Sequence, residues 1–204
     1  MFEINENNEV VRERLTRAVL AGISLDDEDI SSSMYELKGL AEAAGAEVLG
    51  EIVQVRQRPD KATYIGKGKV EELAEMCRNM EANTVIFNNE LSGAQLRNLE
   101  DAVGVTVLDR TILILDIFAA RASSAEGRLQ VELAQLQYRL PRLTGFGRSL
   151  SRTGGGIGTR GPGEKKLETD RRHIQSRMDE IKREIRDVQR SREVQRSRRE
   201  KSEI

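Results

Sequence analysis

The segment from Arg139 to Gly163 combines the residue types that could contact a polyanion. It contains eight glycines and five arginines, and it has no acidic residue. Arginine pairs with phosphate oxygens through parallel hydrogen bonds, and glycine lets the backbone approach a ligand without a Cβ in the way. The combination predicts contact with a nucleic acid, RNA in particular. An ordinary linker is the alternative, although simple linkers do not concentrate arginine while excluding acids.

We predict that this segment and the basic residues that follow it form an RNA-binding site. The glycines would allow close backbone approach, and the charged side chains would attract phosphates. The predicted contact residues are Arg148, Arg152, Gly154, Gly155, Gly156, Gly158, Arg160, Gly161, Gly163, Lys165, Lys166, Arg171 and Arg172.

A second group that could hold a phosphate is Gly66, Lys67, Gly68 and Lys69. These residues fall between an expected strand and an expected helix, where free amides and two lysines could bind an anion. A glycine-punctuated turn with surface lysines is the alternative interpretation. If the phosphate site is real, the region 58–69 could bind ATP.

Other chemistry is not supported by the motifs. A phosphate-binding GxxxxGK[ST] loop is missing, because Gly158 to Gly163 is followed by Glu164, and no DxxG or NKxD sequence follows this glycine-rich stretch. Gly154–Gly156 is followed by Ile157, so no Gly-Gly-Gln tripeptide for peptide release exists. We therefore expect these 204 residues to have no catalytic residue and no GTP hydrolysis.

The single Cys77 and the single His173 cannot assemble a zinc site or a cysteine–histidine nucleophile. We expect Cys77 to pack on a helix face and His173 to be solvated or to face a phosphate. One cysteine, an acidic N-terminus and the lack of a long apolar stretch predict a cytoplasmic protein without a membrane contact.

Charge is distributed unevenly along the chain. Residues 1–109 contain 11 basic and 21 acidic residues, whereas residues 110–204 contain 22 basic and 13 acidic residues. This asymmetry indicates that only the second half faces a polyanion, although a solvated helical surface would also explain it. A content of 33% charged and 3% aromatic residues favours long solvated helices over a thick globule.

The first half, residues 1–109, alternates strands with helices. Short apolar runs predict strands at 17–24, 47–57, 84–88 and 105–109, and helices are expected at 33–44, 68–80, 92–103 and from 111 onward. Capping boxes are predicted for Ser33 with Glu36 and for Ser92 with Gln95. The pattern predicts an α/β fold with a small, mostly parallel four-stranded sheet and flanking helices. Ligands would bind where the loops 58–68, 88–92 and 109–111 share the carboxyl edge.

The second half, residues 110–204, shows apolar residues at spacings of three and four from Phe118 to Leu143 and again from Leu167 to Val188. Two such stripes predict a long antiparallel helical hairpin of the coiled-coil type, with a glycine-rich tip at 144–165. With about 30 residues in each helix, the arm would be about 45 Å long.

Five sequence segments together resemble the HflX family of GTPases. They cover about residues 10–190, and several are long and specific. The matching segments are RPDKATYIGKGKVEEL (58–73), VIFNNELS (85–92), LDRT (108–111), ILDIFAARASSAEGRLQVELAQLQYRLPRL (114–143) and GGGIGTRGPGEKKLETDRR (154–172).

The resemblance implies a function that the residues alone do not. Members of this family bind the large ribosomal subunit, place the glycine-rich tip near the peptidyl-transferase region, and split or rescue ribosomes under stress. The family's GTP and magnesium belong to a G domain that follows the second helix, and this sequence stops at Ile204 before any G-domain motif. We therefore expect a monomer that docks on ribosomal RNA. A free-standing RNA-binding module and an ATP-binding α/β domain are the alternatives.

Overall fold

The computed structural model describes residues 16–26, 28–143 and 162–202, and for the last helix the side chains of 168–196. The chain divides into two compact units. The described residues of 1–90 and 98–113 form the α/β unit, and those of 91–97 and 114–204 form the helical unit.

The α/β unit is built on a four-stranded sheet with the order β2-β1-β3-β4. Its strands are β1 (Arg17–Leu25), β2 (Glu47–Arg56), β3 (Thr84–Phe87) and β4 (Thr106–Asp109). All three strand pairings are parallel, so the predicted sheet is confirmed and is parallel throughout. The sequences of the central strands β1 and β3 explain the parallel arrangement. Both are nearly continuous apolar runs, which are typical of parallel sheets covered by helices on both faces.

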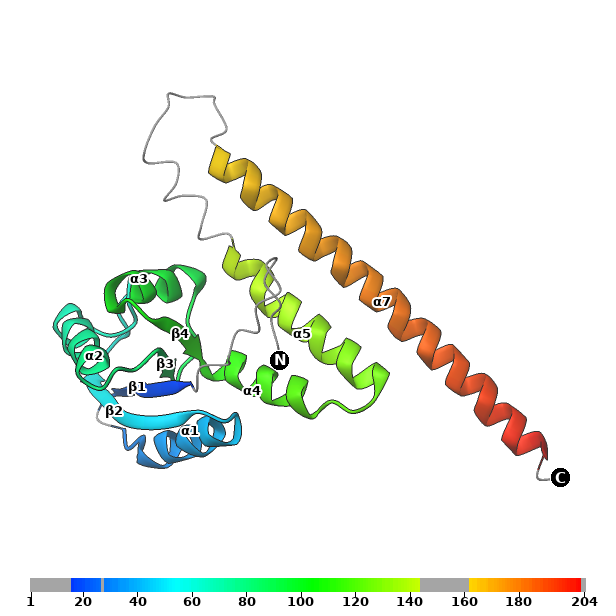
Figure 1. Cartoon of the computed structure of the whole chain (residues 1–204), viewed down its shortest axis with the longest axis horizontal. Helices are drawn as coiled ribbons and strands as arrows, with labels where there is room; N and C mark the ends of the chain where they lie inside the picture. Colours follow the sequence, from blue (N-terminus) through cyan, green and yellow to red (C-terminus); the bar gives the residue numbers. More distant parts are fainter. Residues whose placement is uncertain (1–15, 27, 144–161, 203–204) are drawn as a thin grey trace. The chain divides into compact units, whose positions relative to one another are not determined.

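Helices cover both faces of this sheet (Figure 1). The helix α1 (Ser31–Ala43) lies on one face, and α2 (Lys67–Asn79) and the end of α3 (Gly93–Val103) lie on the other. Connections between parallel strands are right-handed crossovers, so the face that a helix covers depends on the direction in which the chain moves along the sheet. The chain moves in one direction from β1 to β2, and in the opposite direction from β2 to β3 and β4, so α1 lies on one face and the later helices lie on the other. The helix α2 buries Cys77 at the end of a stripe of apolar side chains, as predicted.

The core of the α/β unit lies between the central strands and these helices. Phe87, Leu20, Leu37 and Leu73 are fully buried. Tyr64 packs edge-on against Phe87, with 6.4 Å between the ring centroids. Tyr64 is half-buried and has a positive φ of 66°, so the loop after β2 holds a strained backbone where this ring meets Phe87.

One of the two predicted capping boxes is correct. Ser92 and Gln95 exchange hydrogen bonds at the start of α3, as predicted. Ser33 does not cap α1, because the helix already begins at Ser31 and the Ser33 hydroxyl is hydrogen-bonded to Asn88. The Glu36 side chain pairs with Arg110 instead of reaching back to the helix start.

The helical unit contains most of α4 (Arg110–Arg121), α5 (Ala125–Leu143) and α7 (Pro162–Ser202). The prediction of one helix of about 30 residues before the tip was wrong, because the chain breaks between α4 and α5. Ser124 causes the break: its hydroxyl accepts the Gly127 amide at 3.0 Å and caps α5. A Cβ on Gly127 would lie 2.9 Å from that hydroxyl oxygen, so glycine leaves room for the cap.

The helices α5 and α7 run antiparallel. Glu132 of α5 pairs with Arg177 of α7, and the earlier Glu126 pairs with the later Arg192. At 41 residues, α7 is longer than predicted, whereas α5 has only 19. The segment that would join the two helices, residues 144–161, lies outside the described residues, so the glycine-rich tip stays a prediction.

No helix within the described part of the chain is both long and apolar enough to span a membrane.

Candidate nucleic-acid interface

The predicted RNA-binding residues lie in and directly after residues 144–161, which we call the arginine–glycine segment. Those from Arg148 to Gly161 fall outside the described residues. Gly163, Lys165 and Lys166 belong to the first turns of α7, which begins at Pro162. Proline is favoured at the first helical position because it has no amide hydrogen to leave unpaired. The last residues of the predicted loop 144–165 are therefore helical.

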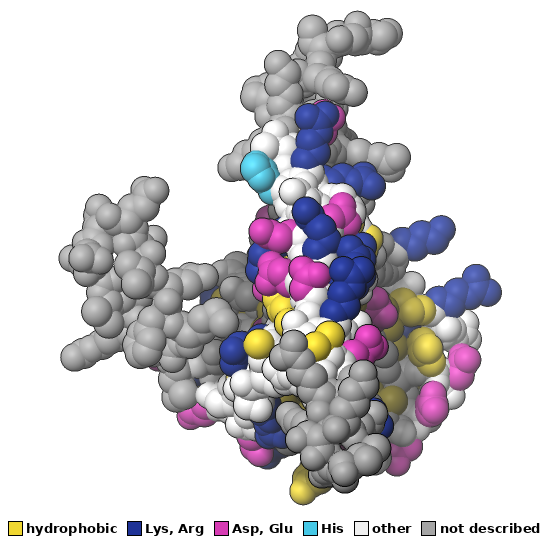
Figure 2. All heavy atoms as spheres, turned by 90° about the vertical axis from the view of Figure 1, so that its right-hand side faces the viewer, with side chains coloured by type: hydrophobic (Ala, Val, Ile, Leu, Met, Phe, Trp, Pro, Cys, Tyr) yellow, Lys and Arg dark blue, Asp and Glu magenta, His cyan; other side chains and the backbone are white. Residues whose placement is uncertain are grey.

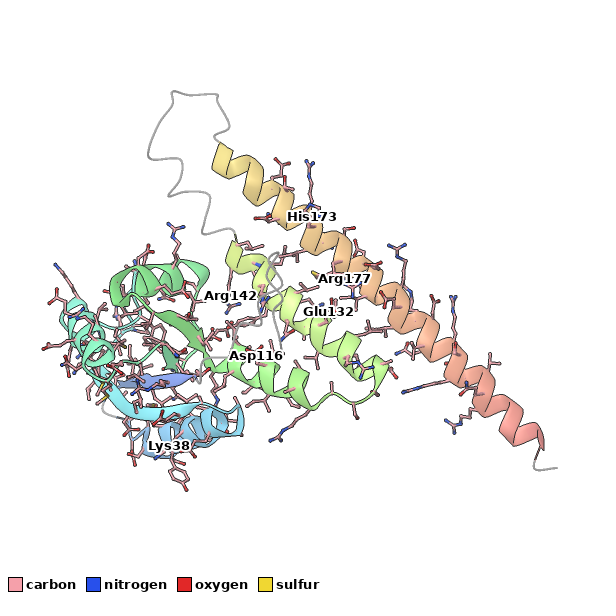
Figure 3. All side chains as sticks on the ribbon, viewed as in Figure 1. Lys38, Asp116, Glu132, Arg142, His173 and Arg177 are labelled. Atoms are coloured by element: carbon pink, nitrogen blue, oxygen red, sulfur yellow. The ribbon has the colours of Figure 1, made fainter. Side chains whose placement is uncertain are left out.

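Arg171 and Arg172 are exposed on α7, close to the arginine–glycine segment in sequence. The Arg172 guanidinium pairs with Glu168 at 2.6 Å, an exposed contact of one helical turn. Exposed pairs of this kind are weak and screened by salt, so Arg172 can exchange this partner for a phosphate. His173 is also exposed and lies on the same turn (Figure 3), which agrees with the predicted solvated position.

The end of α5, where the arginine–glycine segment begins, is tightly packed. The Arg142 guanidinium stacks 3.2 Å from the centroid of the Tyr138 ring and donates to the Tyr138 carbonyl oxygen at 2.9 Å. The Arg142 backbone packs on Gly93: a Cβ at Gly93 would lie 2.8 Å from the Arg142 Cα atom. Only glycine allows this approach, so the start of α3 fixes the end of α5.

An ion-pair network joins α5 to α7 (Figure 3). Arg177 binds both carboxylate oxygens of Glu132, at 2.8 and 3.1 Å, and also contacts Glu180 and Glu184 of its own helix. The hydrogen bonds that Arg177 donates to Glu132 are the main reason why the pKa of Arg177 is raised. Because the pairing is antiparallel, α5 ends and α7 begins at the same end of the helix pair. The arginine–glycine segment connects the chain at that end.

We did not predict this ion-pair network, although the sequence contains a signal for it. Glu132 precedes Leu133 and Arg177 precedes Met178, so each charged residue flanks a position of the apolar stripe. Charges that flank the apolar seam of paired helices commonly form interhelical ion pairs.

The second predicted site, Gly66 to Lys69, forms the first turn of α2 with Gly66 as the capping residue. The Gly66 amide already donates to the Gln54 side chain at 2.8 Å, and Lys69 pairs with Glu72 at 2.7 Å. The Arg56 guanidinium lies directly over Gly66. The structure brings the four residues together. Two of the candidate phosphate ligands, the Gly66 amide and the Lys69 side chain, are already bonded to other residues of the chain. A phosphate site here stays a prediction.

A polar cluster that we did not predict lies at the carboxyl edge of the sheet. Arg110, directly after β4, donates to Ser33 of α1 and to Asn88 after β3, at 3.3 Å each, and it pairs with Glu36 at 2.6 Å. These groups come from three separate segments and satisfy one another, so the cluster needs no ligand to be stable. We interpret it as a structural link between α1, β3 and the start of α4.

Within the described residues, no group of three or more histidine, cysteine, aspartate or glutamate side chains could hold a metal ion.

Comparison with known proteins matches nearly the whole chain. Residues 31–119 match the model for the N-terminal region of GTP-binding GTPases, and residues 121–199 match the model for their middle region. The chain is 57% identical to the GTPase HflX of Caldanaerobacter subterraneus subsp. tengcongensis over 92% of its length, and 43% identical to that of Escherichia coli K12 over 92%. In both cases it spans 44% of the relative's length.

The fold is also similar to solved structures. A GTP-binding protein from the archaeon Sulfolobus solfataricus, solved in complex with GDP, superposes with a TM-score of 0.59 at 22% sequence identity. The match covers 85% of this chain and 46% of that protein. This likeness is one of fold.

A parallel α/β unit followed by long paired helices, matched in succession by these two models, defines the N-terminal and middle regions of a GTP-binding protein. Among GTP-binding proteins, the chain belongs to the HflX family. The resemblance seen in the five sequence segments is thus confirmed.

Proposed function

We propose that this chain is the ribosome-binding part of an HflX-type protein and that it binds RNA of the large ribosomal subunit through the arginine–glycine segment. One observation carries the proposal: an acid-free run with arginines and glycines joins two antiparallel helices at one end. A pair of helices can deliver such a segment into a narrow cleft, where arginines meet phosphates and glycines allow the backbone to approach.

In the whole protein, we propose that this docking serves GTP-dependent splitting or rescue of ribosomes under stress, in the cytoplasm. The described residues do not fit a GTP site, because the Gly66 amide and Lys69 are bound within the chain and no phosphate-binding loop motif is present. GTP and magnesium therefore belong to another part of the whole protein in this proposal. The isolated 204 residues should bind large subunits as a monomer without hydrolysing GTP.

The first test measures binding of the chain to separated ribosomal subunits at several salt concentrations. Replacing Arg148, Arg152 and Arg160 with glutamine should weaken binding to the large subunit. The slope of log affinity against log salt should fall by about 0.7–0.9 for each lost phosphate contact. A matched control replaces the exposed Lys38, Lys61 and Arg78 of the α/β unit with glutamine, which removes the same charge.

The second variant separates backbone approach from charge. Replacing Gly154, Gly155 and Gly156 with alanine adds three Cβ atoms without changing the charge, so affinity should fall while the salt slope stays nearly constant. Folding stability should not fall. Equal affinity of this folded variant and the wild-type chain would reduce the segment to a linker, and strong GTP turnover by the chain would contradict the division of roles.

A further inference from the structure

The strand β2 forms one edge of the sheet, and its outer side is unpaired. Among the described residues, β1 is the only strand that pairs with β2 (Figure 1). The opposite edge strand, β4, has only four residues, whereas β2 has ten and contains no proline or lysine. Proteins usually protect a free edge with short strands, prolines or lysines, because its amides and carbonyls can pair with another chain. The long edge of β2 lacks these protections.

The peptide groups of Glu51, Val53 and Val55 face the free edge. The Arg56 carbonyl accepts the Asp26 amide at 3.2 Å, so this carbonyl faces the side of β1. Peptide groups alternate in direction along a strand, and the pairing with β1 is regular after the register shift near the start of β2. The amides and carbonyls of the three outward-facing residues are therefore available to an added strand.

A groove of about 610 Å³ lies beside this edge, between β2 and α1. Its apolar lining comes from Ile30, Met34, Tyr35 and Val53. Met34 is buried, whereas Tyr35 is 80% exposed and Val53 is 37% exposed. Alternate side chains of a strand lie on one face, so the exposed Val55 continues this apolar surface. A strand added to the edge would have apolar groups for its alternate side chains to contact.

The charge of the groove determines which kind of strand would fit. Glu28, Asp29 and Glu51 line it, with Lys38 of α1 as the basic residue (Figure 3). The carboxylates of Glu28 and Glu51 form no ion pair with any described residue. Asp29 also keeps its charge, because hydrogen bonds from Ser31 lower the pKa of its carboxyl. Three carboxylates against one ammonium group leave the groove acidic, so it favours a basic partner.

The wider charge distribution argues against a second copy of this chain as the partner. Residues 1–109 contain 11 basic and 21 acidic residues, so two copies would bring like charges together at β2. The surface of α7 differs, because acidic and basic side chains are intermixed along it (Figure 2), Asp187 and Arg190 among them. An excess of one sign, as in the groove beside β2, can select a partner by its charge.

We propose that the free edge of β2 binds an extended, basic segment of a partner protein by strand addition. The backbone of the segment would pair with that of Glu51, Val53 and Val55. Its apolar side chains would pack on Val53 and Tyr35, and its basic side chains would pair with Glu51 and Glu28. The proposal does not rest on the proposed function, because none of the predicted RNA-binding residues belongs to β2 or α1.

The test titrates the isotopically labelled full chain with the peptide Lys-Thr-Val-Thr-Val-Thr-Lys. Its alternate side chains are lysine and valine, and its sequence is the same in both directions, so it can pair in either orientation. NMR follows the backbone amides of Glu51, Val53 and Val55. One control peptide has glutamate in place of each lysine. The other is methylated on its central amide nitrogens, so it keeps the charge but cannot donate hydrogen bonds to a strand.

We expect the lysine peptide to shift these three amides and both control peptides to bind much more weakly. Val53→Lys combined with Val55→Lys puts positive charge on the edge and should weaken binding by about tenfold or more. The matched control is Phe118→Lys combined with Val194→Lys, at apolar side chains of the helical unit that are 58% and 52% exposed. This control variant should bind the peptide like the wild-type chain.

Glu28→Gln combined with Glu51→Gln should weaken binding by about threefold, because each exposed charge pair contributes little. Every replaced side chain is exposed, so circular dichroism should show that all variants are folded.

Three results would overturn the proposal: no shift of the β2 amides by the lysine peptide, equal binding of the glutamate peptide, or equal binding of the methylated peptide. A fourth is self-association. If the β2 amides shifted when the wild-type chain alone was concentrated, and the variant with lysines at both valines of β2 stayed monomeric, the partner would be a second copy and the proposal would be wrong.

Discussion

The two units of this chain are held together in different ways. In the α/β unit, the central strands and the helices that cover them bury large apolar side chains completely, Phe87 and Leu20 among them. In the helical unit, α5 has no buried residue along its whole length, and α7 buries Met178 and Ile181 among its described side chains. Ion pairs between helices take a larger part there, through Arg177 and Arg192.

This difference has a physical consequence. A core of fully buried apolar side chains is not weakened by ionic screening, and its stability is spread over many contacts. A pair of helices that depends on few buried positions and on half-exposed charges is more easily changed by a single substitution or by salt. A unit of that kind leaves most of its surface polar and available to a partner, which is compatible with the RNA-binding role that we propose for it.

The largest expected effect is that of Ile181→Asp. Ile181 is fully buried in a unit with few such residues, and an unpaired carboxylate there costs several kcal/mol. The pairing of α5 and α7 should be lost, while the α/β unit keeps its cooperative unfolding. Hydrogen exchange of the two units measures both effects at once. The control is Val194→Asp, at a side chain that is 52% exposed on the same helix, and it should be close to wild type. Complete loss of cooperative unfolding in Ile181→Asp would instead indicate one intertwined unit.

Smaller effects on stability are expected for two glycine-to-alanine changes. One should destabilise the helical unit, and the other should stabilise the α/β unit. Gly93→Ala places a Cβ against the Arg142 backbone, which cannot move as a flexible side chain would, so it should cost about 1–3 kcal/mol. Gly39, inside α1, has no atom within 4 Å of an added Cβ. Gly39→Ala should therefore stabilise the α/β unit, by about 0.5–1 kcal/mol. Thermal unfolding of both variants tests the comparison, and destabilisation by Gly39→Ala would contradict it.

A smaller effect again is expected for the Glu132–Arg177 pair. A double-mutant cycle with Glu132→Gln and Arg177→Gln should give a favourable coupling, because two parallel hydrogen bonds join the side chains. Both side chains are about 40% exposed, so water screens the pair and the coupling should decrease as salt is added. A coupling that did not depend on salt would show that packing, and not charge, joins these helices.

The sequence predicted the parts of the fold that depend on local patterns. The apolar runs of β1 and β3 and the stripe that ends at Cys77 were sufficient to place the sheet and its helices. The capping box of Ser92 and Gln95 was also recognisable, since both partners lie within one turn. By contrast, the Ser33 hydroxyl binds Asn88, which is 55 residues away, and no local pattern indicates such a partner.

The break between α4 and α5 was missed for an identifiable reason. The apolar spacing continues across Ser124, so periodicity alone predicted one helix; the cap to Gly127 was the missing signal. The arginines of α7 were visible in the sequence, but which of them pair with α5, as Arg177 and Arg192 do, depends on the face of α7 that meets α5. The candidate site could be predicted as a segment of the sequence. The contacts between α5 and α7 at its two ends could not, because they depend on the tertiary structure.

The smallest expected effect concerns Asp116 of α4, which lies in the helical unit and accepts a hydrogen bond from Gln135 at 2.9 Å. Asp116 is an exposed residue, but partial desolvation of its carboxyl raises the pKa above the ordinary value of 3.8, and the Gln135 hydrogen bond and the charge of Arg139 oppose this only in part. The folded state therefore prefers the protonated acid, and ionisation costs stability as the pH rises through the raised pKa. Asp116→Asn cannot ionise and still accepts the hydrogen bond, so the variant should be slightly more stable than wild type at neutral pH. The advantage should vanish below about pH 3.8, where the carboxyl is protonated in both the folded and the unfolded states.

Urea unfolding at several pH values, with NMR titration of the Asp116 carboxyl, measures the difference and its cause together. A less stable Asp116→Asn variant at neutral pH would mean that attraction to Arg139 outweighs the cost of partial desolvation, and that charge pairing stabilises α4 in the same way as it stabilises α5 and α7.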